Sequence, residues 1–193
     1  MTPKVLSPEA WDLVRRLVAG GHLDSWILAG GTGRALQLGH PYSEALDLFR
    51  TAAFESEILL DRISKVGPVS VQSRSSGTLH LVLEGLRISF LAAEVPLLFP
   101  GTPYRGLTLA DSRDIAVMKL VAIGGRGSRK DFVDLFFYLH AGGSLEATLE
   151  LTRRRFEKID FNDYHLLKSL VFFDDAEAEP MIRMLREVSW LTI

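Results

Sequence analysis

The chain has 193 residues, of which 47% are hydrophobic, so it can bury one substantial core. A formal net charge of −2 gives no bulk electrostatic reason for it to bind a nucleic-acid backbone or an anionic membrane. There is no cysteine, which excludes disulfide bonds and thiolate zinc sites.

The first predicted element is an amphipathic helix from Pro8 to about Gly20. Ser7 supplies an N-cap before Pro8, and apolar residues follow at helical spacing. Charged residues interrupt this helix, so it lacks the apolar core of a signal peptide. No later stretch reaches the roughly eighteen consecutive apolar residues of a membrane-spanning helix. We therefore expect a cytoplasmic protein that makes no membrane contact.

Residues 26–49 predict a strand, a glycine turn, a helix and a second strand. The strands cover residues 26–29 and 45–49, the helix covers 32–38, and Gly30, Gly31 and Thr32 form the turn. A glycine turn at a helix start exposes backbone N–H groups, which bind phosphate. The turn alone is a weak indication, because glycine pairs often serve only to let the chain turn tightly.

Asp47 is the unusual residue of the second strand. Its neighbours on the same strand face are Ala45 and Phe49, and a carboxylate on that apolar face is costly unless it is paired, hydrogen-bonded or metal-bound. An acidic residue at this place can hold a metal ion against a phosphate at the glycine turn. Ser43 and His40 in the preceding loop are further candidates, although turns favour serine for structural reasons as well.

The remaining elements predict an α+β fold. A helix is expected at 54–64, and alternating apolar residues between 69 and 91 predict an antiparallel meander. After a connection rich in proline and glycine at 96–106, only helices are expected, near 111–123, 128–140, 143–156, 162–171 and 175–189, the last interrupted near Pro180. Strands followed by helices favour an α+β arrangement. We expect an α/β core at 1–100 and a helical region at 101–193, packed on it as one compact unit.

Lys119 is the only polar residue between Ile115 and Ile123 in a predicted helix. Its helical neighbours are apolar, so its ammonium group either extends to solvent along the helix surface or serves a buried site. The sequence leaves both interpretations open.

The predicted helix at 128–140 is apolar around almost its whole circumference. Asp131, Asp134 and Tyr138 occupy its one polar strip, which must line a cleft, pair with basic residues or face a gap in the packing. Bracing of Asp131 by Arg126 or Lys119 is the structural interpretation. The five histidines are scattered without the spacing of helical metal ligands, and each is interpreted as structural or exposed.

Several motifs resemble, in order, those of the AbiEii/AbiGii abortive-infection toxins, the nucleotidyltransferase-like toxin halves of type IV toxin–antitoxin pairs. The likeness spans most of the chain, and several motifs in order are more specific than any one alone. The motifs are GGT at 30–32, H-x-x-S-x-x-L-D-L-F at 40–49, K-L-x-A-I-x-x-R at 119–126, K-D-x-x-D-L at 130–135 and LLKSLVFFDDAE near the C-terminus.

The resemblance implies a nucleotidyltransferase fold, with a small mixed sheet flanked by helices and followed by a C-terminal helical region. It also implies transfer of NMP from an NTP to an RNA or protein acceptor, with Mg²⁺ as cofactor and an antitoxin protein as partner. In such proteins the glycine motif cradles the triphosphate and strand acids hold the metal. The implied roles are nucleotide contacts for Gly30, Gly31, Thr32, Ser43 and Arg126, metal binding for Asp47, and catalysis for Asp47, Lys119, Asp131 and Asp134.

The chain departs from the family pattern at the acids. The family usually has an acidic residue two positions before the strand aspartate, where this chain has Ala45, and Glu44 points to the opposite strand face unless a bulge intervenes. Ser89 stands on a later strand where many nucleotidyltransferases have a third acid. Three hypotheses follow: an enzyme weakened by the loss of acidic ligands, a degenerate relative that only binds a nucleotide or a partner, and a metal-free binding domain braced by Lys119 and Asp131.

Overall fold

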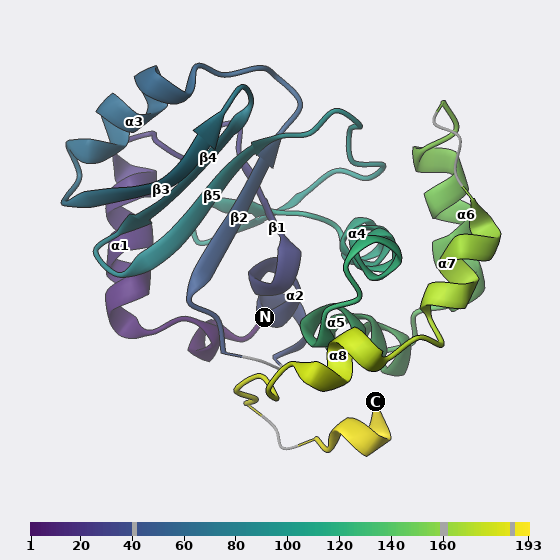
Figure 1. Cartoon of the computed structure of the whole chain (residues 1–193). Coiled ribbons are helices and arrows are strands. Elements are labelled where there is room, and N and C mark those ends of the chain that lie inside the picture. Colours follow the sequence, from purple (N-terminus) through teal and green to yellow (C-terminus); the bar gives the residue numbers. More distant parts are fainter. Residues whose placement is uncertain (40–41, 159–161, 186–187) are drawn as a thin grey trace.

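The computed structural model describes residues 1–39, 42–158, 162–185 and 188–193, which form a mixed α/β fold around one seven-stranded sheet (Figure 1). The strands are β1 (Ile27–Ala29), β2 (Ala45–Arg50), β3 (Val69–Ser75), β4 (Thr78–Leu83), β5 (Leu86–Ala92), β6 (Thr102–Tyr104) and β7 (Leu107–Leu109). The α-helices are α1 (Pro8–Ala19), α2 (Gly30–Leu38), α3 (Ser56–Ser64), α4 (Ser112–Gly125), α5 (Arg129–His140), α6 (Leu145–Arg155), α7 (Asp163–Ser169) and α8 (Asp174–Ala178). Short 3-10 helices cover Pro3–Val5 and Trp190–Thr192.

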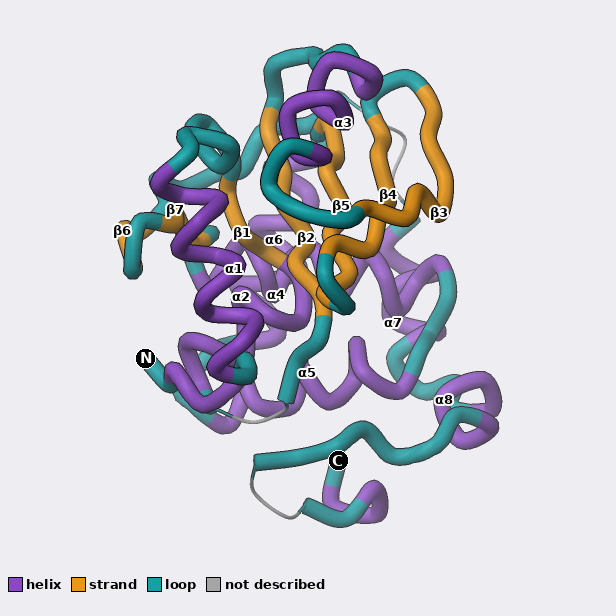
Figure 2. The backbone as a smooth tube through the Cα atoms, turned by 90° about the vertical axis from the view of Figure 1, so that its left-hand side faces the viewer, coloured by secondary structure: helices purple, strands orange, loops and turns teal. Residues whose placement is uncertain are grey.

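The sheet is mixed, with the strand order β3-β4-β5-β2-β1-β7-β6. The predicted meander is confirmed, because β3, β4 and β5 pair antiparallel in sequence. β2 pairs parallel with β5 and antiparallel with β1, and β1 pairs parallel with β7. Figure 2 shows the strands side by side, with β6 at the left, β3 at the right, and α1 and α3 in front of them.

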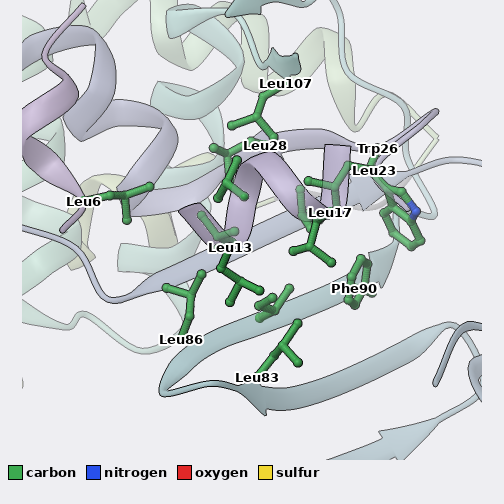
Figure 3. Packing of buried hydrophobic residues seen from close by; sticks show 14 of the residues in the cluster. Leu6, Leu13, Leu17, Leu23, Trp26, Leu28, Leu83, Leu86, Phe90 and Leu107 are labelled. Carbon is green, nitrogen blue, oxygen red and sulfur yellow. The ribbon is translucent and has the colours of Figure 1, made fainter. Parts of the chain in front are cut away.

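The main hydrophobic core fills the space between α1, α3 and one face of the sheet (Figure 3). Leu13 and Leu17 of α1 pack there with Leu46 and Leu48 of β2 and Phe90 of β5. The helix begins as predicted, since the Ser7 side chain accepts a hydrogen bond from the Ala10 N–H. Because strand side chains alternate, the residues between these core positions face the opposite side of the sheet.

A second core joins the helices that follow the sheet. Buried side chains of α4, α5 and α7 form it, with Leu120, Phe132, Leu135 and Leu166 among them. No helix among the described residues is long and apolar enough to cross a membrane.

Two parts of the chain differ from the sequence prediction. β6 and β7 lie where only a connection and helices were expected. Pro103 in β6 counts against a strand, and β7 is recognised by its pairing with β1. The helix expected at 175–189 ends at Ala178. Glu179 is extended, with φ −82° and ψ 147°, because a residue before proline is disfavoured in helical geometry.

Candidate active site

A cavity of about 510 Å³ opens on the face of β2, β5 and β4 that is turned away from α1. The start of α2 forms one wall, and α4 and α5 form the wall facing the sheet. The cavity brings together all nine predicted site residues: Gly30, Gly31, Thr32, Ser43, Asp47, Lys119, Arg126, Asp131 and Asp134. His40, the other loop candidate, lies outside the described residues.

The glycine turn and Asp47 are held against each other by the pairing of β1 with β2. Asp47 is the register partner of Ala29, the residue before the turn. Gly30 has a positive φ of 61°, and a Cβ atom there would lie 2.4 Å from Asp47 Oδ2. Only glycine fits this position, because the backbone geometry and the carboxylate both exclude a side chain. A Cβ on Gly31 would lie 3.6 Å from Asp134 Oδ2, an ordinary contact distance.

Thr32 and Ser43 hold the turn in place through their hydroxyl groups. The Thr32 and Ser43 hydroxyls are hydrogen-bonded at 2.5 Å, and the Thr32 hydroxyl also donates to the Ala45 carbonyl. These contacts fasten the first turn of α2 to the chain entering β2. The first backbone N–H groups of a helix have no partner within the helix, so a ligand in the cavity can accept hydrogen bonds from them.

Lys119 is buried inside the site. Its Nζ lies 2.9 Å from Asp131 Oδ1 and 2.5 Å from Asp134 Oδ2, and its side chain is 6% exposed. Burial disfavours the charge, but the two carboxylates outweigh burial and raise the pKa of Lys119. Of the two interpretations left open by the sequence, extension of the ammonium to solvent is therefore wrong.

Asp131 is fully enclosed and accepts hydrogen bonds at both oxygens. Arg126 donates to it from Nε at 2.8 Å and from Nη2 at 3.1 Å, Lys119 donates at 2.9 Å, and the Ser128 hydroxyl donates at 2.7 Å. Burial alone would raise the pKa of Asp131, but these hydrogen bonds and the charge of Lys119 lower it to about 2. Bracing by Arg126 and Lys119 is confirmed, and it occurs within the cavity wall.

Ser128 was not identified as a site residue from the sequence. Its position three residues before Asp131, at a helix start, was the available indication, since such pairs often exchange hydrogen bonds there.

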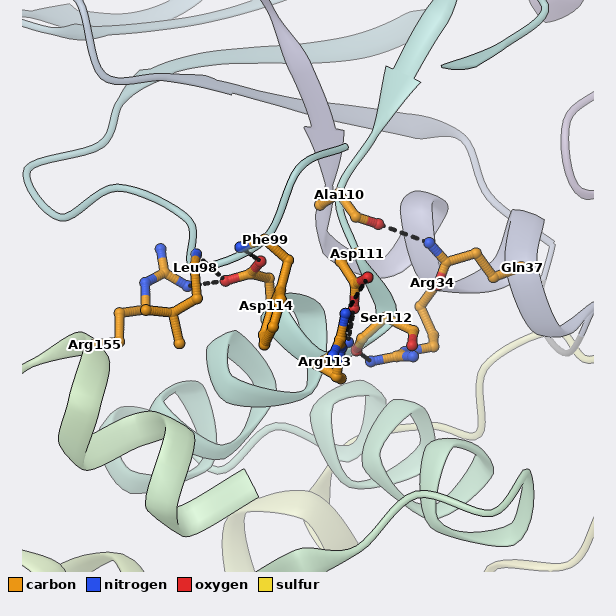
Figure 4. Close-up of polar contacts among 10 residues, drawn as sticks. All are labelled: Arg34, Gln37, Leu98, Phe99, Ala110, Asp111, Ser112, Arg113, Asp114 and Arg155. Atoms are coloured by element: carbon orange, nitrogen blue, oxygen red, sulfur yellow. Dashed lines mark hydrogen bonds and ion pairs between the residues drawn. The ribbon is translucent and has the colours of Figure 1, made fainter. Parts of the chain in front are cut away.

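Buried polar contacts fix α4, and with it Lys119, relative to the rest of the molecule (Figure 4). The Asp114 carboxylate accepts hydrogen bonds from the N–H groups of Leu98 and Phe99, at 2.8 Å and 3.0 Å. Arg34 of α2 donates from Nη2 to the Ser112 carbonyl at 2.6 Å. The start of α4 is therefore tied both to the loop after β5 and to α2.

Arg34 is itself an unexpected feature, because its side chain is completely buried in the helix that follows the glycine turn. Its guanidinium lies 4.8 Å from the centre of the Tyr138 ring, and burial lowers the pKa of Arg34 to about 10 despite the nearby charge of Asp134. The partners come from α4 and α5, so the sequence around Arg34 contained no indication of them.

A polar row crosses the open face of the sheet beside Asp47. Ser89 of β5 is the register partner of Asp47, and His80 of β4 is the register partner of Ser89. His80 Nδ1 and Ser89 Oγ are hydrogen-bonded at 3.0 Å, and all three residues line the cavity. The sequence prediction treated His80 as structural or exposed. Its partner Ser89 lies on another strand, so the sequence around His80 did not indicate this contact.

The acidic residues do not gather into a multi-ligand metal centre. Among the described residues, no three histidine or acidic side chains form a group that could hold a metal ion.

Comparison with known proteins identifies a relative over most of the chain. No family model matches the chain. The uncharacterized protein aq_aa25 of Aquifex aeolicus is 35% identical over 181 residues, which cover 90% of this chain and 86% of the relative. The chain belongs to the same family as this Aquifex protein.

Solved structures that match this chain show its fold class. JHP933 of Helicobacter pylori matches with a TM-score of 0.52 at 17% identity, over 86% of this chain and 90% of that one. A Helicobacter pylori protein described as a candidate nucleotidyltransferase matches with a TM-score of 0.52 at 16% identity, over 86% of this chain and 93% of that one. The antibiotic-resistance factor ANT(2'')-Ia matches with a TM-score of 0.57 at 13% identity, over 83% of this chain and 95% of that one. The fold is that of nucleotidyltransferases, as the sequence resemblance implied.

Proposed function

We propose that the protein is a nucleotidyltransferase that moves NMP from an NTP to a hydroxyl group of an RNA or protein, and that it acts as an AbiEii-like toxin. The observation that carries the proposal is the convergence of the glycine turn, Asp47 and Lys119 on one cavity. Its volume of about 510 Å³ is within the range of small-molecule sites.

The glycine turn is the proposed cradle for the triphosphate. Gly30, Gly31 and Thr32 at the start of α2 line the cavity together with Asp47, and anions bind well at such a helix start. Arg126 adds positive charge at the cavity, with a side chain that is 58% exposed while it braces Asp131. Thr32 and Ser43 shape the turn through their mutual hydrogen bond.

Asp47 is the proposed ligand of Mg²⁺. Because Gly30 has no Cβ, the Asp47 carboxylate can lie directly against the glycine turn, so an ion held by this carboxylate would be next to phosphates bound at the turn. Magnesium needs only one or two protein carboxylates when substrate phosphates and water complete its shell, so this donor set fits one ion. When bound, the ion would neutralise the charge that develops on the transferred phosphate.

We assign positioning roles to Lys119, Asp131 and Asp134. Both oxygens of Asp131 already accept from Arg126, Lys119 and Ser128, so Asp131 orients the two cations and does not itself contact the nucleotide. Lys119 in turn holds Asp134 beside Gly31. This network keeps charged groups fixed at the cavity wall before the substrate arrives, which is how enzymes stabilise developing charge.

The competing candidate is a degenerate relative that binds a nucleotide or a partner protein without transferring NMP. It is favoured by the lack of a three-ligand metal group among the described residues and by Ser89 at the register position next to Asp47. This candidate predicts nucleotide binding without any product.

Transfer of labelled NMP tests the proposal. Purified protein is incubated with each of the four α-labelled NTPs, with Mg²⁺ or Mn²⁺, and with cellular RNA and protein as acceptors. We expect label on one acceptor class, and a loss of at least roughly 100-fold with Asp47→Asn. Asp61→Asn is the matched control, since Asp61 is exposed on α3, forms an ion pair with Lys65 and does not line the cavity, so full activity is expected.

Absence of label with all four nucleotides and both metals would contradict the transferase, and tight nucleotide binding in the same preparation would favour the degenerate relative. The toxin role has a separate readout. Expression of the wild-type protein should arrest growth of its host cell, and Asp47→Asn should not.

A further inference from the structure

The row formed by Asp47, Ser89 and His80 places an imidazole inside the proposed active site. The three residues lie on the adjacent strands β2, β5 and β4, in direct register and on the same sheet face. Neighbouring strands are about 4.8 Å apart, so His80 lies on the order of 10 Å from Asp47 along the row. A ligand long enough to span this row would contact Asp47 at one end and His80 at the other.

The contact with Ser89 engages Nδ1 of His80, so Nε2 is the ring nitrogen left for another partner. When Nδ1–H donates to the Ser89 hydroxyl oxygen, the neutral ring carries its free lone pair on Nε2. Within the described residues, no hydrogen bond engages Nε2. His80 lines the cavity and is half-buried, so this lone pair is accessible to a molecule bound there.

We propose that His80 is the general base that removes the proton from the acceptor hydroxyl. This inference rests on the proposed nucleotidyl transfer. The acceptor oxygen forms a bond to the α-phosphorus, the bond from that phosphorus to the pyrophosphate oxygen breaks, and pyrophosphate leaves with the electron pair. The hydroxyl proton passes to Nε2 of His80, which afterwards returns it to water.

This role suits the scarcity of acids in the row. Ser89 cannot accept a proton at neutral pH, whereas a histidine has a lone pair of suitable basicity for proton transfer there. The hydrogen bond to Ser89 holds the imidazole ring in place. Catalytic bases in other enzymes are likewise held by a neighbouring hydrogen-bonding group. His80 thus supplies the proton acceptor that a carboxylate at Ser89 would otherwise provide.

The charges around His80 come from every wall of the cavity. Arg87 lies two residues before Ser89 on the same strand, and β3 contributes the uncharged Ser73 opposite His80. The remaining charged groups that share the cavity are Glu44, Asp47, Lys119, Arg126, Lys130 and the paired acids of α5, Asp131 and Asp134. Removal of the imidazole leaves all of them in place, so any change in the pH profile of such a variant is assigned to His80.

The pH dependence of His80→Ala tests the proposal. In the wild-type protein, kcat/KM should rise with pH on the acid side of its profile, as expected when a base must be deprotonated to act. In His80→Ala we expect kcat/KM to fall roughly 10²–10⁴-fold and the rising limb to disappear. Added imidazole should restore part of the rate in the variant, and no part of it in Asp47→Asn.

Three further variants complete the experiment. His140→Ala is the matched control, because His140 is exposed at the end of α5 and contacts Phe136 of the same helix, so an unchanged profile is expected. His80→Gln keeps a donor for Ser89 but has no base, and should be as inactive as His80→Ala. Ser89→Ala keeps the base, and should retain the rising limb at a lower rate. Nucleotide affinity by calorimetry verifies that each variant is folded.

The outcomes separate this inference from the proposed function. If the wild-type protein transfers no label, the transferase fails and the base fails with it. If the wild-type protein is active, while His80→Ala and His80→Gln bind nucleotide normally and keep both rate and pH limb, only the role of His80 is overturned. Loss of rate without rescue by imidazole and with an unchanged pH limb also overturns it, because that result indicates a structural role.

Discussion

At the residue scale, the molecule concentrates buried charge around Asp131. Its carboxylate has no exposure and accepts hydrogen bonds from two cations and a hydroxyl. Such a group is favourable only as a complete set, because removal of one member leaves a buried charge without its partner. The completeness of the set explains why Asp131 and Lys119 can lie inside an apolar helix pair.

The stability contributed by Asp131 should depend on pH. Its pKa is lowered from 3.8 to about 2 in the folded protein, so its contribution is fully present above about pH 4 and is lost as the pH falls toward 2. A shift of this size corresponds to about 2 kcal/mol. Urea unfolding measured from pH 5 downward should show this loss for the wild-type protein.

Asp131→Asn should lack that pH dependence and should be less stable at pH 7 by about 3 kcal/mol, because Arg126 and Lys119 lose a buried partner. Asp61→Asn is the control, since an exposed pair within one helix contributes at most about 0.5 kcal/mol. An identical pH dependence in Asp131→Asn and the wild type would assign the acid sensitivity to other carboxylates.

At the scale of elements, the junction of β1, α2 and β2 sets the position of the proposed phosphate cradle. Gly30→Ala should destabilise the protein by about 1–2 kcal/mol through its left-handed backbone and should also push the new methyl group into the Asp47 carboxylate. Nucleotide affinity should fall strongly. Gly31→Ala is the matched control, because its Cβ meets only an ordinary contact and its φ is not positive.

Calorimetric titration with nucleotide and chemical unfolding of both variants measure these effects. Equal losses of affinity in Gly30→Ala and Gly31→Ala would mean that the contact with Asp47 does not govern the cradle. The two glycines then would serve only as a flexible turn, which is the structural interpretation that the sequence left open.

Elements with a cap and a full apolar period were predictable from sequence. α1 begins at its Ser7 cap, and β4 and β5 of the meander follow the period of two, whereas β3 is exposed along almost its whole length. β6 and β7 were not predicted, because Pro103 in β6 counts against a strand and β7 is recognised by its pairing with β1. The interruption expected near Pro180 is confirmed, since α8 ends at Ala178 and Glu179 before the proline is extended, but the helix does not resume at residues 181–185.

The sequence revealed those site residues that are polar within an otherwise apolar strand face or helix. Asp47 on an apolar strand face and Lys119 on an apolar helix are anomalies that the sequence alone reveals. His80 and Arg34 did not stand out in this way, because a half-buried strand tolerates a histidine and a short helix tolerates an arginine. Their importance comes from Ser89 and Tyr138, which only the tertiary fold brings next to them.

At the scale of the whole molecule, the cavity joins the two hydrophobic cores. Its floor is the sheet packed on α1 and α3, and its facing wall is α4 and α5 of the second core. The three tryptophans report on both parts, since Trp11 and Trp26 belong to the first core and Trp190 packs on the second. A ligand that spans the cavity contacts the sheet on one side and α4 and α5 on the other, and should stabilise these two parts together.

Thermal unfolding should therefore show one transition, with coincident tryptophan fluorescence and circular dichroism. A magnesium nucleotide at 100 times its Kd should raise the free energy of unfolding by about 2.7 kcal/mol and shift the single transition upward. Asp47→Asn should lose the magnesium-dependent part of this shift, and Asp61→Asn should keep it. Two transitions, of which the nucleotide shifts only one, would show that the ligand contacts a single core, and the cavity between sheet and helices would then not be its binding site.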